Sequence, residues 1–258
     1  MDLGLTGRTA LVTGASKGIG FAAAESLAQA GCNLHLASRT RPDLEAAHAK
    51  LKEQYGVKVE IHAVDLSDGD AARALIERCK DVDILVNNAG AIPAGDIHAI
   101  TEDRWRDAWN LKVFGYQNMC RAMLAHMRER GNGVIVNVIG AAGEAHSPAY
   151  IAGTAGNASI MAMTRALGAI SRAYGVRVVG INPGLIVTGR MTTLMRTKAE
   201  KELGDADRWE ELIDKTYPPG RPEHIGDMVA FLASDRSANT TGTIITIDGG
   251  SSARGTSV

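Results

Sequence analysis

The chain has 258 residues, of which 45% are hydrophobic and 22% charged, and this is the composition of an ordinary globular protein. Its formal net charge of −1 gives no electrostatic reason to expect nucleic acid or an anionic membrane as a main partner. No apolar run approaches the ~20 residues of a membrane-spanning helix, and the N-terminus does not resemble a signal peptide, so we expect a cytoplasmic protein.

Short segments rich in valine and isoleucine alternate with longer amphipathic segments along the chain. Because runs that are apolar throughout are typical of strands buried on both faces, we interpret the short segments as strands of a parallel sheet. Strands that alternate with helices predict right-handed crossovers and a doubly wound α/β fold, and no linker or repeat divides residues 1–258 into two domains. The predicted order is strand 8–13, helix 18–30, strand 33–38, helix 42–54, strand 58–65, helix 67–79, strand 83–88, helix 101–130, strand 133–139, helix 150–174, strand 177–182, helix 224–234 and strand 243–248.

Residues 189–217 depart from this alternation. They follow a strand and read as a helical insertion in which a lid could form. Its apolar side chains would then face a substrate, or they would simply pack. They are Met191, Leu194, Met195, Trp209 and Leu212.

The three cysteines lie far apart in the sequence and form no CxxC pair. They are Cys32, Cys79 and Cys120. We therefore expect three reduced cysteines and neither a disulfide framework nor a metal site.

A glycine-rich turn follows the first predicted strand, in TALVTGASKGIG (9–20). Gly14, Gly18 and Gly20 form a variant of the dinucleotide fingerprint rather than its usual spacing. Glycine allows a sharp turn and a close approach of the backbone to a pyrophosphate, and the following helix N-terminus offers free N–H groups. The turn therefore favours a nucleotide ligand over a strand–helix turn without one.

The second predicted strand ends at Ser38-Arg39, where an acid would bind the ribose hydroxyls of NAD. No acid stands there. Arg39 and Lys17 could clamp a 2′-phosphate, which favours NADP(H) over NAD(H), although Arg39 could also be a solvated loop residue.

At this point the sequence resembles the short-chain dehydrogenase/reductases (SDRs), and among them the oxoacyl-carrier-protein-reductase-like members, over nearly its whole length. The motifs that carry the resemblance are Thr13-Gly14-x3-Gly18-Ile19-Gly20, Asp65, Asn87-Asn88-Ala89-Gly90, Asn110, Tyr150, Asn182-Pro183-Gly184 with Thr188, Gly220-Arg221-Pro222-Glu223, Phe231-Leu232-Ala233-Ser234 and Asp248-Gly249-Gly250. The resemblance implies a single-domain Rossmann fold with a seven-stranded parallel sheet and helices on both faces. It also implies a homo-oligomer, a tetramer or dimer, built on the long helices 101–130 and 150–174.

The resemblance also assigns cofactor contacts to positions along the chain. It implies that Ser16, Lys17, Gly18 and Ile19 hold the pyrophosphate and that Asp65 and Leu66 meet the adenine. Near the nicotinamide and its ribose it places Asn87, Ala89, Gly90, Pro183, Gly184, Ile186 and Thr188.

The family's catalysis rests on Asn, Ser, Tyr and a Lys four residues after the Tyr, and here only Asn110 and Tyr150 match. Thr154 stands where the family has its Lys, which binds the ribose and lowers the pKa of the Tyr. The Thr154 hydroxyl could bind the ribose, but it carries no charge that would lower the pKa of the Tyr. Gly140 stands where the family has its Ser.

A histidine and a serine, His146 and Ser147, precede Tyr150 in a shortened loop. They could substitute for the missing donors, or they could be ordinary surface residues.

Three functions remain open at this stage. The first is an NADP-dependent reductase of a carbonyl or secondary alcohol with a remodelled site. The second is an NADP-binding scaffold, sensor or inactive subunit. The third is elimination or isomerisation through Tyr150, for which the sequence offers no positive sign. We favour the reductase because the other site positions match the family.

Overall fold

Seven parallel strands form one sheet in the order β3-β2-β1-β4-β5-β6-β7. The structure is a computed structural model and describes residues 2–254. The strands are β1 (Thr9–Thr13), β2 (Asn33–Ser38), β3 (Val59–Ala63), β4 (Ile84–Asn87), β5 (Gly133–Val138), β6 (Val176–Pro183) and β7 (Ile244–Ile247). The chain builds from β1 outward to β3 and then returns to the other side of β1, so the strand order reverses between β1 and β4. Ligands of open α/β sheets bind outside the carboxyl ends of strands at such a point.

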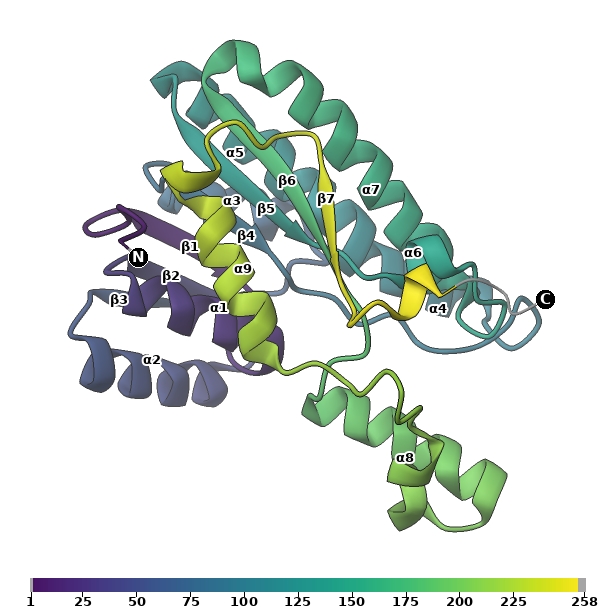
Figure 1. The fold of residues 1–258 in the computed structure, drawn as a ribbon. Helices are drawn as coiled ribbons and strands as arrows, with labels where there is room; N and C mark the ends of the chain where they lie inside the picture. The colour runs from purple at the N-terminus through teal and green to yellow at the C-terminus, as the bar shows by residue number, and fades with distance from the viewer. Residues whose placement is uncertain (1, 255–258) are drawn as a thin grey trace.

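Helices cover both faces of the sheet (Figure 1). The side chains of Ala10 and Val12 pack with α1, α2 and α9, whereas Leu11 between them packs with α3 and α5, as the alternation of a strand requires. No helix within residues 2–254 combines the length and apolar character needed to cross a membrane. The α-helices are α1 (Gly18–Gln29), α2 (Arg41–Tyr55), α3 (Gly69–Arg78), α4 (Glu102–Trp109), α5 (Gly115–Arg130), α6 (Ala142–Ala145), α7 (Ile151–Ser171), α8 (Gly189–Leu203) and α9 (Pro222–Ala233).

The predicted doubly wound α/β fold is confirmed, and its elements differ from the prediction mainly at their ends. The predicted helix 101–130 is α4 and α5 joined without a break by a π-helical turn (Asn110–Phe114). Short 3-10 turns follow three other helices or strands. They lie at Arg172–Tyr174, Asp235–Ser237 and Ser251–Ala253. The four-residue α6 was not predicted, because so short a segment carries no hydrophobic periodicity.

The predicted helical insertion is α8 followed by a 3-10 helix (Ala206–Leu212). Figure 1 shows both projecting from the body of the domain beyond the end of β6. Thr188 begins α8 by accepting a hydrogen bond from the Met191 N–H at 3.2 Å. Met191 is buried, whereas the side chain of Leu194 is 45% exposed, so this element buries only part of its apolar surface.

Candidate active site

The glycine turn between β1 and α1 has a left-handed backbone that strongly favours glycine. Gly14 and Gly18 have φ of 63° and 58°. A β-carbon on Gly20 would lie 2.1 Å from the Gly14 carbonyl oxygen. The turn therefore depends on all three glycines that the sequence singles out.

Asn88, just beyond β4, fastens this turn to the neighbouring strand. Its amide Nδ2 donates to the carbonyl oxygens of Thr13 at 3.1 Å and Gly14 at 3.3 Å. The Thr13 hydroxyl accepts from the N–H groups of Asn88 at 2.9 Å and Ala89 at 3.1 Å. Neither the local sequence nor the family resemblance predicts this role for Asn88. The double asparagine at a strand end was the available signal, since an amide is well suited to bridging backbone groups.

The side chain of Asn87 points into the protein rather than toward the carboxyl edge. It is 1% exposed, and its Nδ2 donates to Asn137 Oδ1 at 2.9 Å. Asn87 as a whole is therefore buried, and the groups of this segment that a ligand could reach are those of Ala89 and Gly90, which are half-buried.

The N-terminus of α1 is open to an anion. Lys17 stands at the N-cap without a side-chain hydrogen bond to the helix, and the first turn holds no acidic residue. The Ser16 hydroxyl lies 3.1 Å from that of Ser38 at the end of β2. Free N–H groups and the positive end of the helix dipole are what a phosphate group requires. Ile19 is partly buried against the core below this turn.

Charged side chains gather at the ends of β2 and β3. Arg39 is exposed, and Lys17 Nζ lies 3.6 Å from the Asp43 carboxylate on α2. Burial alone would raise the pKa of Asp65, but hydrogen bonds from Ser67 and the charge of Arg39 lower it below its usual value. Arg39 therefore lies close enough to Asp65 to interact with it, and Leu66 is buried in the core beside it.

The chain after β6 closes the other end of this edge. A β-carbon on Gly184 would lie 2.5 Å from Asp248 Cβ, so this turn also requires glycine. Buried Ile186 forms a bridge with Gly220. A β-carbon on Gly18 would lie 3.4 Å from the Thr188 methyl group. The segment that begins at Pro183 therefore meets the glycine turn across the edge of the sheet.

A cleft of about 620 Å³ runs along this edge. It brings together Arg39 and Asp65 at one end, Asn110 of the π-helical turn, and Arg190 and Leu194 of α8. Three predicted site residues, Arg39, Asp65 and Asn110, thus line one cavity together with Leu194 of the predicted insertion.

Tyr150 stands behind the wall of this cleft rather than lining it. Its ring packs with Ile92 and Ala108, which do line the cleft, and it lies across Gly153, where a β-carbon would come within 1.9 Å of Cε1. Burial raises the pKa of the Tyr150 hydroxyl, and the charge of Arg190 partly opposes that rise. The phenol is therefore protonated at neutral pH.

The two residues proposed as substitutes make no hydrogen bond to Tyr150 through their side chains within the described part of the chain. His146 is exposed at the end of α6 with φ of 48°. The Thr154 hydroxyl donates to the Ser147 carbonyl oxygen at 3.3 Å. The hydroxyl proton of Thr154 is therefore engaged in a hydrogen bond within its own segment. The role of His146 or Ser147 as a substitute donor stays a prediction.

Gly140, which the resemblance aligns with the family serine, has a conformation that a serine would not easily adopt. Its φ is 148°, and a β-carbon there would lie 2.8 Å from Asn157 Nδ2. Asn157 is 4% exposed, and its Oδ1 has no hydrogen-bond partner within residues 2–254. The amide of Asn157 thus stands beside the space where the serine side chain would be.

Two cationic side chains near the site, Arg190 and Lys112, are not predicted from the sequence. Arg190, in the first turn of α8, donates to the carbonyl oxygens of Gly90 at 2.9 Å and Ile92 at 2.5 Å. Lys112 is buried and donates to the Tyr116 hydroxyl at 2.7 Å and the Val138 carbonyl at 2.8 Å. Burial lowers the pKa of Lys112 to about 7, and Arg190 adds to that effect.

A glycine turn at the strand-order reversal, followed by a helix N-terminus free of acids, defines an α/β protein of the dinucleotide-binding class. The model of the short chain dehydrogenase family matches residues 8–199, so the chain belongs to that family.

Three known proteins show how close the similarity is. The chain is 33% identical over 253 residues to the 3-oxoacyl-(acyl-carrier-protein) reductase of Chlamydia trachomatis serovar D, which covers 95% of this chain and 98% of that protein. The crystal structure of L-sorbose reductase from Gluconobacter frateurii with NADPH and L-sorbose matches with a TM-score of 0.90 at 29% identity, covering 96% of this chain and 98% of that one. An NAD+-bound xylitol dehydrogenase matches with a TM-score of 0.88 at 27% identity, covering 95% and 99%. The resemblance to oxoacyl-carrier-protein-reductase-like members is thereby confirmed.

Proposed function

We propose that this protein is an NADP(H)-dependent oxidoreductase that transfers hydride between the nicotinamide and a carbonyl or secondary alcohol, with a remodelled catalytic site. The observation that carries the proposal is the cleft of about 620 Å³, which joins Arg39 and Asp65 at the predicted adenosine end to Asn110 and Arg190 at the predicted reacting end. When bound, the cofactor supplies or accepts the hydride.

The preference for the phosphorylated cofactor rests on Arg39. Solved relatives with this fold bind either form, as the NADPH and NAD+ complexes illustrate. In this chain the end of β2 carries an exposed cation and no acid. An Arg forms bidentate, charge-assisted hydrogen bonds with a phosphate, whereas a ribose diol favours a carboxylate.

The proton in this reaction would come from Tyr150. Because burial raises its pKa, the phenol is protonated at neutral pH and can donate to the oxygen of a carbonyl that receives hydride. The same shift makes the phenolate scarce, so the residue is a poor base for alcohol oxidation. The raised pKa therefore favours carbonyl reduction over alcohol oxidation at neutral pH.

Two neighbouring groups would replace the missing family side chains. Arg190 supplies a positive charge whose effect reaches the Tyr150 hydroxyl, as the family Lys would. The Asn157 amide beside Gly140 supplies a hydrogen-bond donor near the space of the family Ser. A missing donor of this kind typically costs ~2.7–4 kcal/mol in transition-state stabilisation, so a substitute is needed for useful rates.

A second function, cofactor binding without turnover, is favoured by the position of Tyr150 behind the cleft wall. The local hydrogen bond of Thr154 to Ser147 also supports this alternative. Such a protein would bind NADPH as a scaffold, a sensor or an inactive subunit.

The deciding experiment measures NADPH binding by fluorescence and NADPH oxidation with ketones and oxoacyl thioesters on the same preparation. We expect turnover in the native chain, its loss in Tyr150→Phe, and no loss in the control Tyr55→Phe, which removes a remote hydroxyl at the end of α2. Binding without turnover would support the second function. If the protein binds neither NADPH nor NADH, both proposed functions are wrong.

A homo-oligomer is also part of the proposal. A groove of about 560 Å³ lies between α5 and α7, and its apolar lining includes Met163, Leu167 and Ile170, the last of which is 53% exposed. Arg121 and Arg128 also line it. The helices α5 and α7 are the two on which the family resemblance predicts association.

A further inference from the structure

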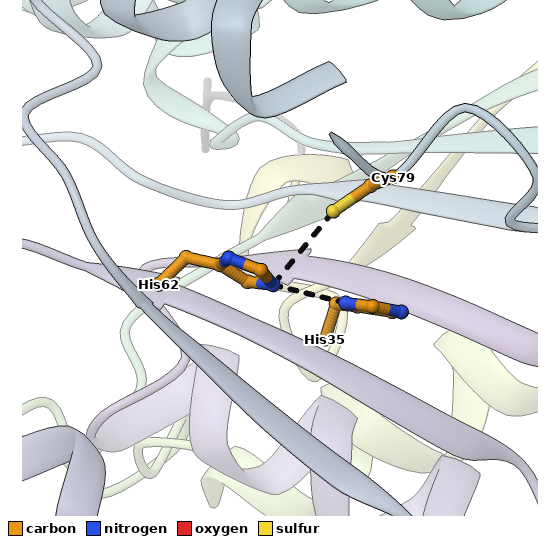
Figure 2. A group of neighbouring side chains, drawn as sticks. All are labelled: His35, His62 and Cys79. Carbon is orange, nitrogen blue, oxygen red and sulfur yellow. Dashed lines mark hydrogen bonds between the residues drawn. The ribbon is translucent and has the colours of Figure 1, made fainter. Parts of the chain in front are cut away.

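Three side chains with metal-binding atoms meet near one edge of the sheet, outside the cleft described above. Figure 2 shows His35 from β2, His62 from β3 and Cys79 from the end of α3 facing one another. His35 Nδ1 lies 2.9 Å from His62 Nε2, which lies 3.7 Å from Cys79 Sγ. All three atoms lie within 4.8 Å of one another.

The pairing of β2 with β3 explains why the two imidazoles share a face. His35 pairs with Glu60, and His62 is two residues farther along β3, so all three side chains project to the same side. That side is the one on which Ala37 packs with α3. Cys79 follows the last residue of α3, Arg78, and is buried there.

The spacing suits a tetrahedral zinc ion after a small adjustment. Zinc bonds to nitrogen at ~2.0–2.1 Å and to sulfur at ~2.3 Å, so ligand atoms around it lie roughly 3.3–3.6 Å apart. Two of the three separations are near this range already. The widest needs a contraction of about 1 Å, which rotation of partly exposed side chains can supply.

A fourth ligand of suitable chemistry stands next to the cluster. Glu60 Oε2 lies 3.7 Å from His35 Nδ1, and its side chain is 70% exposed and free to move. A Cys79 thiolate and the Glu60 carboxylate together would neutralise a divalent ion. Two imidazoles, a thiolate and a carboxylate or water are donors that zinc accepts.

We propose that His35, His62 and Cys79 form a zinc site, with Glu60 as the fourth ligand, that ties β2 and β3 to α3. On binding, the thiol proton leaves to solvent. The N–H shared by the two imidazoles is replaced by the ion, and each ring carries its proton on the other nitrogen. The site would fix the spacing of β2 and β3, the two strands that precede Arg39 and Asp65.

The test is a titration of the metal-free full chain with Co²⁺, whose spectrum reports ligand type and geometry without cofactor or substrate. We expect a sulfur-to-cobalt charge-transfer band and the visible bands of tetrahedral cobalt at one equivalent, both removed by Zn²⁺. Cys79→Ala should abolish the charge-transfer band, and His62→Ala should weaken binding at least tenfold. Cys32 is also buried and lies elsewhere in the fold, so Cys32→Ala should change neither the charge-transfer band nor the affinity for cobalt.

Zinc should also raise the unfolding temperature of the native chain and not that of Cys79→Ala, because a ligand that binds only the folded state stabilises it. Circular dichroism and NADPH binding verify that each variant folds. An absent charge-transfer band in the native chain, or one that persists in Cys79→Ala, overturns the proposal. The cluster would then be only a hydrogen-bonded pair of stacked imidazoles beside a thiol.

Discussion

Arg190 connects α8 to the surroundings of Tyr150. Its guanidinium is held by the carbonyl oxygens of Gly90 and Ile92, and Ile92 packs with the Tyr150 ring. Its charge stabilises the phenolate, which opposes the rise in pKa that burial causes. In Arg190→Gln the pKa of Tyr150 should rise further, because only burial then acts on it.

The pH profile of alcohol oxidation tests this role. Oxidation needs the phenolate, so its rate should increase as pH rises toward the pKa of Tyr150, and Arg190→Gln should move that increase to higher pH. Arg190→Lys keeps the charge and should restore the profile of the native enzyme. If Arg190 acted only through its hydrogen bonds, both variants would change KM without moving the pH profile. Equal pH profiles for Arg190→Gln and the native enzyme would therefore contradict a role for the charge.

Gly140 illustrates why the sequence alone describes the catalytic site incompletely. In the sequence, Gly140 stands where the resemblance places the family serine. In the structure its φ of 148° and the nearby Asn157 amide mean that a serine would be strained and crowded. Backbone strain of this kind costs of order 1–3 kcal/mol. Restoring the family residue would therefore perturb the fold as well as the chemistry.

At the scale of elements, the sequence predicts the sheet well because the central strands are nearly continuous apolar runs and the helices between them are longer and amphipathic. Motif residues such as Gly14 and Thr188 share the carboxyl edge because parallel strands all end there. Contacts between segments far apart in the sequence could not be predicted. The bonds of Arg190 to the loop after β4 and the meeting of His62 with Cys79 depend on tertiary packing, which no local spacing records.

The connection between β2 and α2 should control the choice of cofactor. Arg39→Asp removes the cation proposed to bind the 2′-phosphate and adds a carboxylate suited to ribose hydroxyls. A hydrogen bond to a charged group contributes ~1.5–3 kcal/mol, so the Kd for NADPH should increase roughly tenfold to a hundredfold, with a gain for NADH.

The comparison is the ratio of the two Kd values in the native chain, in Arg39→Asp and in Lys80→Asp. The last makes the same charge change at an exposed position after α3. A shifted ratio in Arg39→Asp alone supports the clamp. An unchanged ratio there means that another group binds the phosphate, with Lys17 at the N-cap of α1 the next residue to test.

For the whole molecule, the groove between α5 and α7 should be the surface on which copies of the chain associate. Ile170 is 53% exposed beside Leu167 and Met163, and an isoleucine left in water forgoes the ~1.5–3 kcal/mol that full burial of such a side chain contributes. Ile170→Glu would bring a carboxylate into a largely apolar interface, and its desolvation there is costly even though Arg121 and Arg128 also line the groove. Light scattering should then show a smaller assembly than that of the native chain.

Ile97 provides the matched control for this experiment. It is 56% exposed, and it lies in the segment between β4 and α4 rather than beside the groove. Ile97→Glu adds the same charge and should leave the mass unchanged if association uses α5 and α7. If both variants keep the native mass, the groove is not the interface. If only Ile97→Glu dissociates, association uses the surface near Trp105 and Trp109, where Ile97 lines a separate apolar hollow.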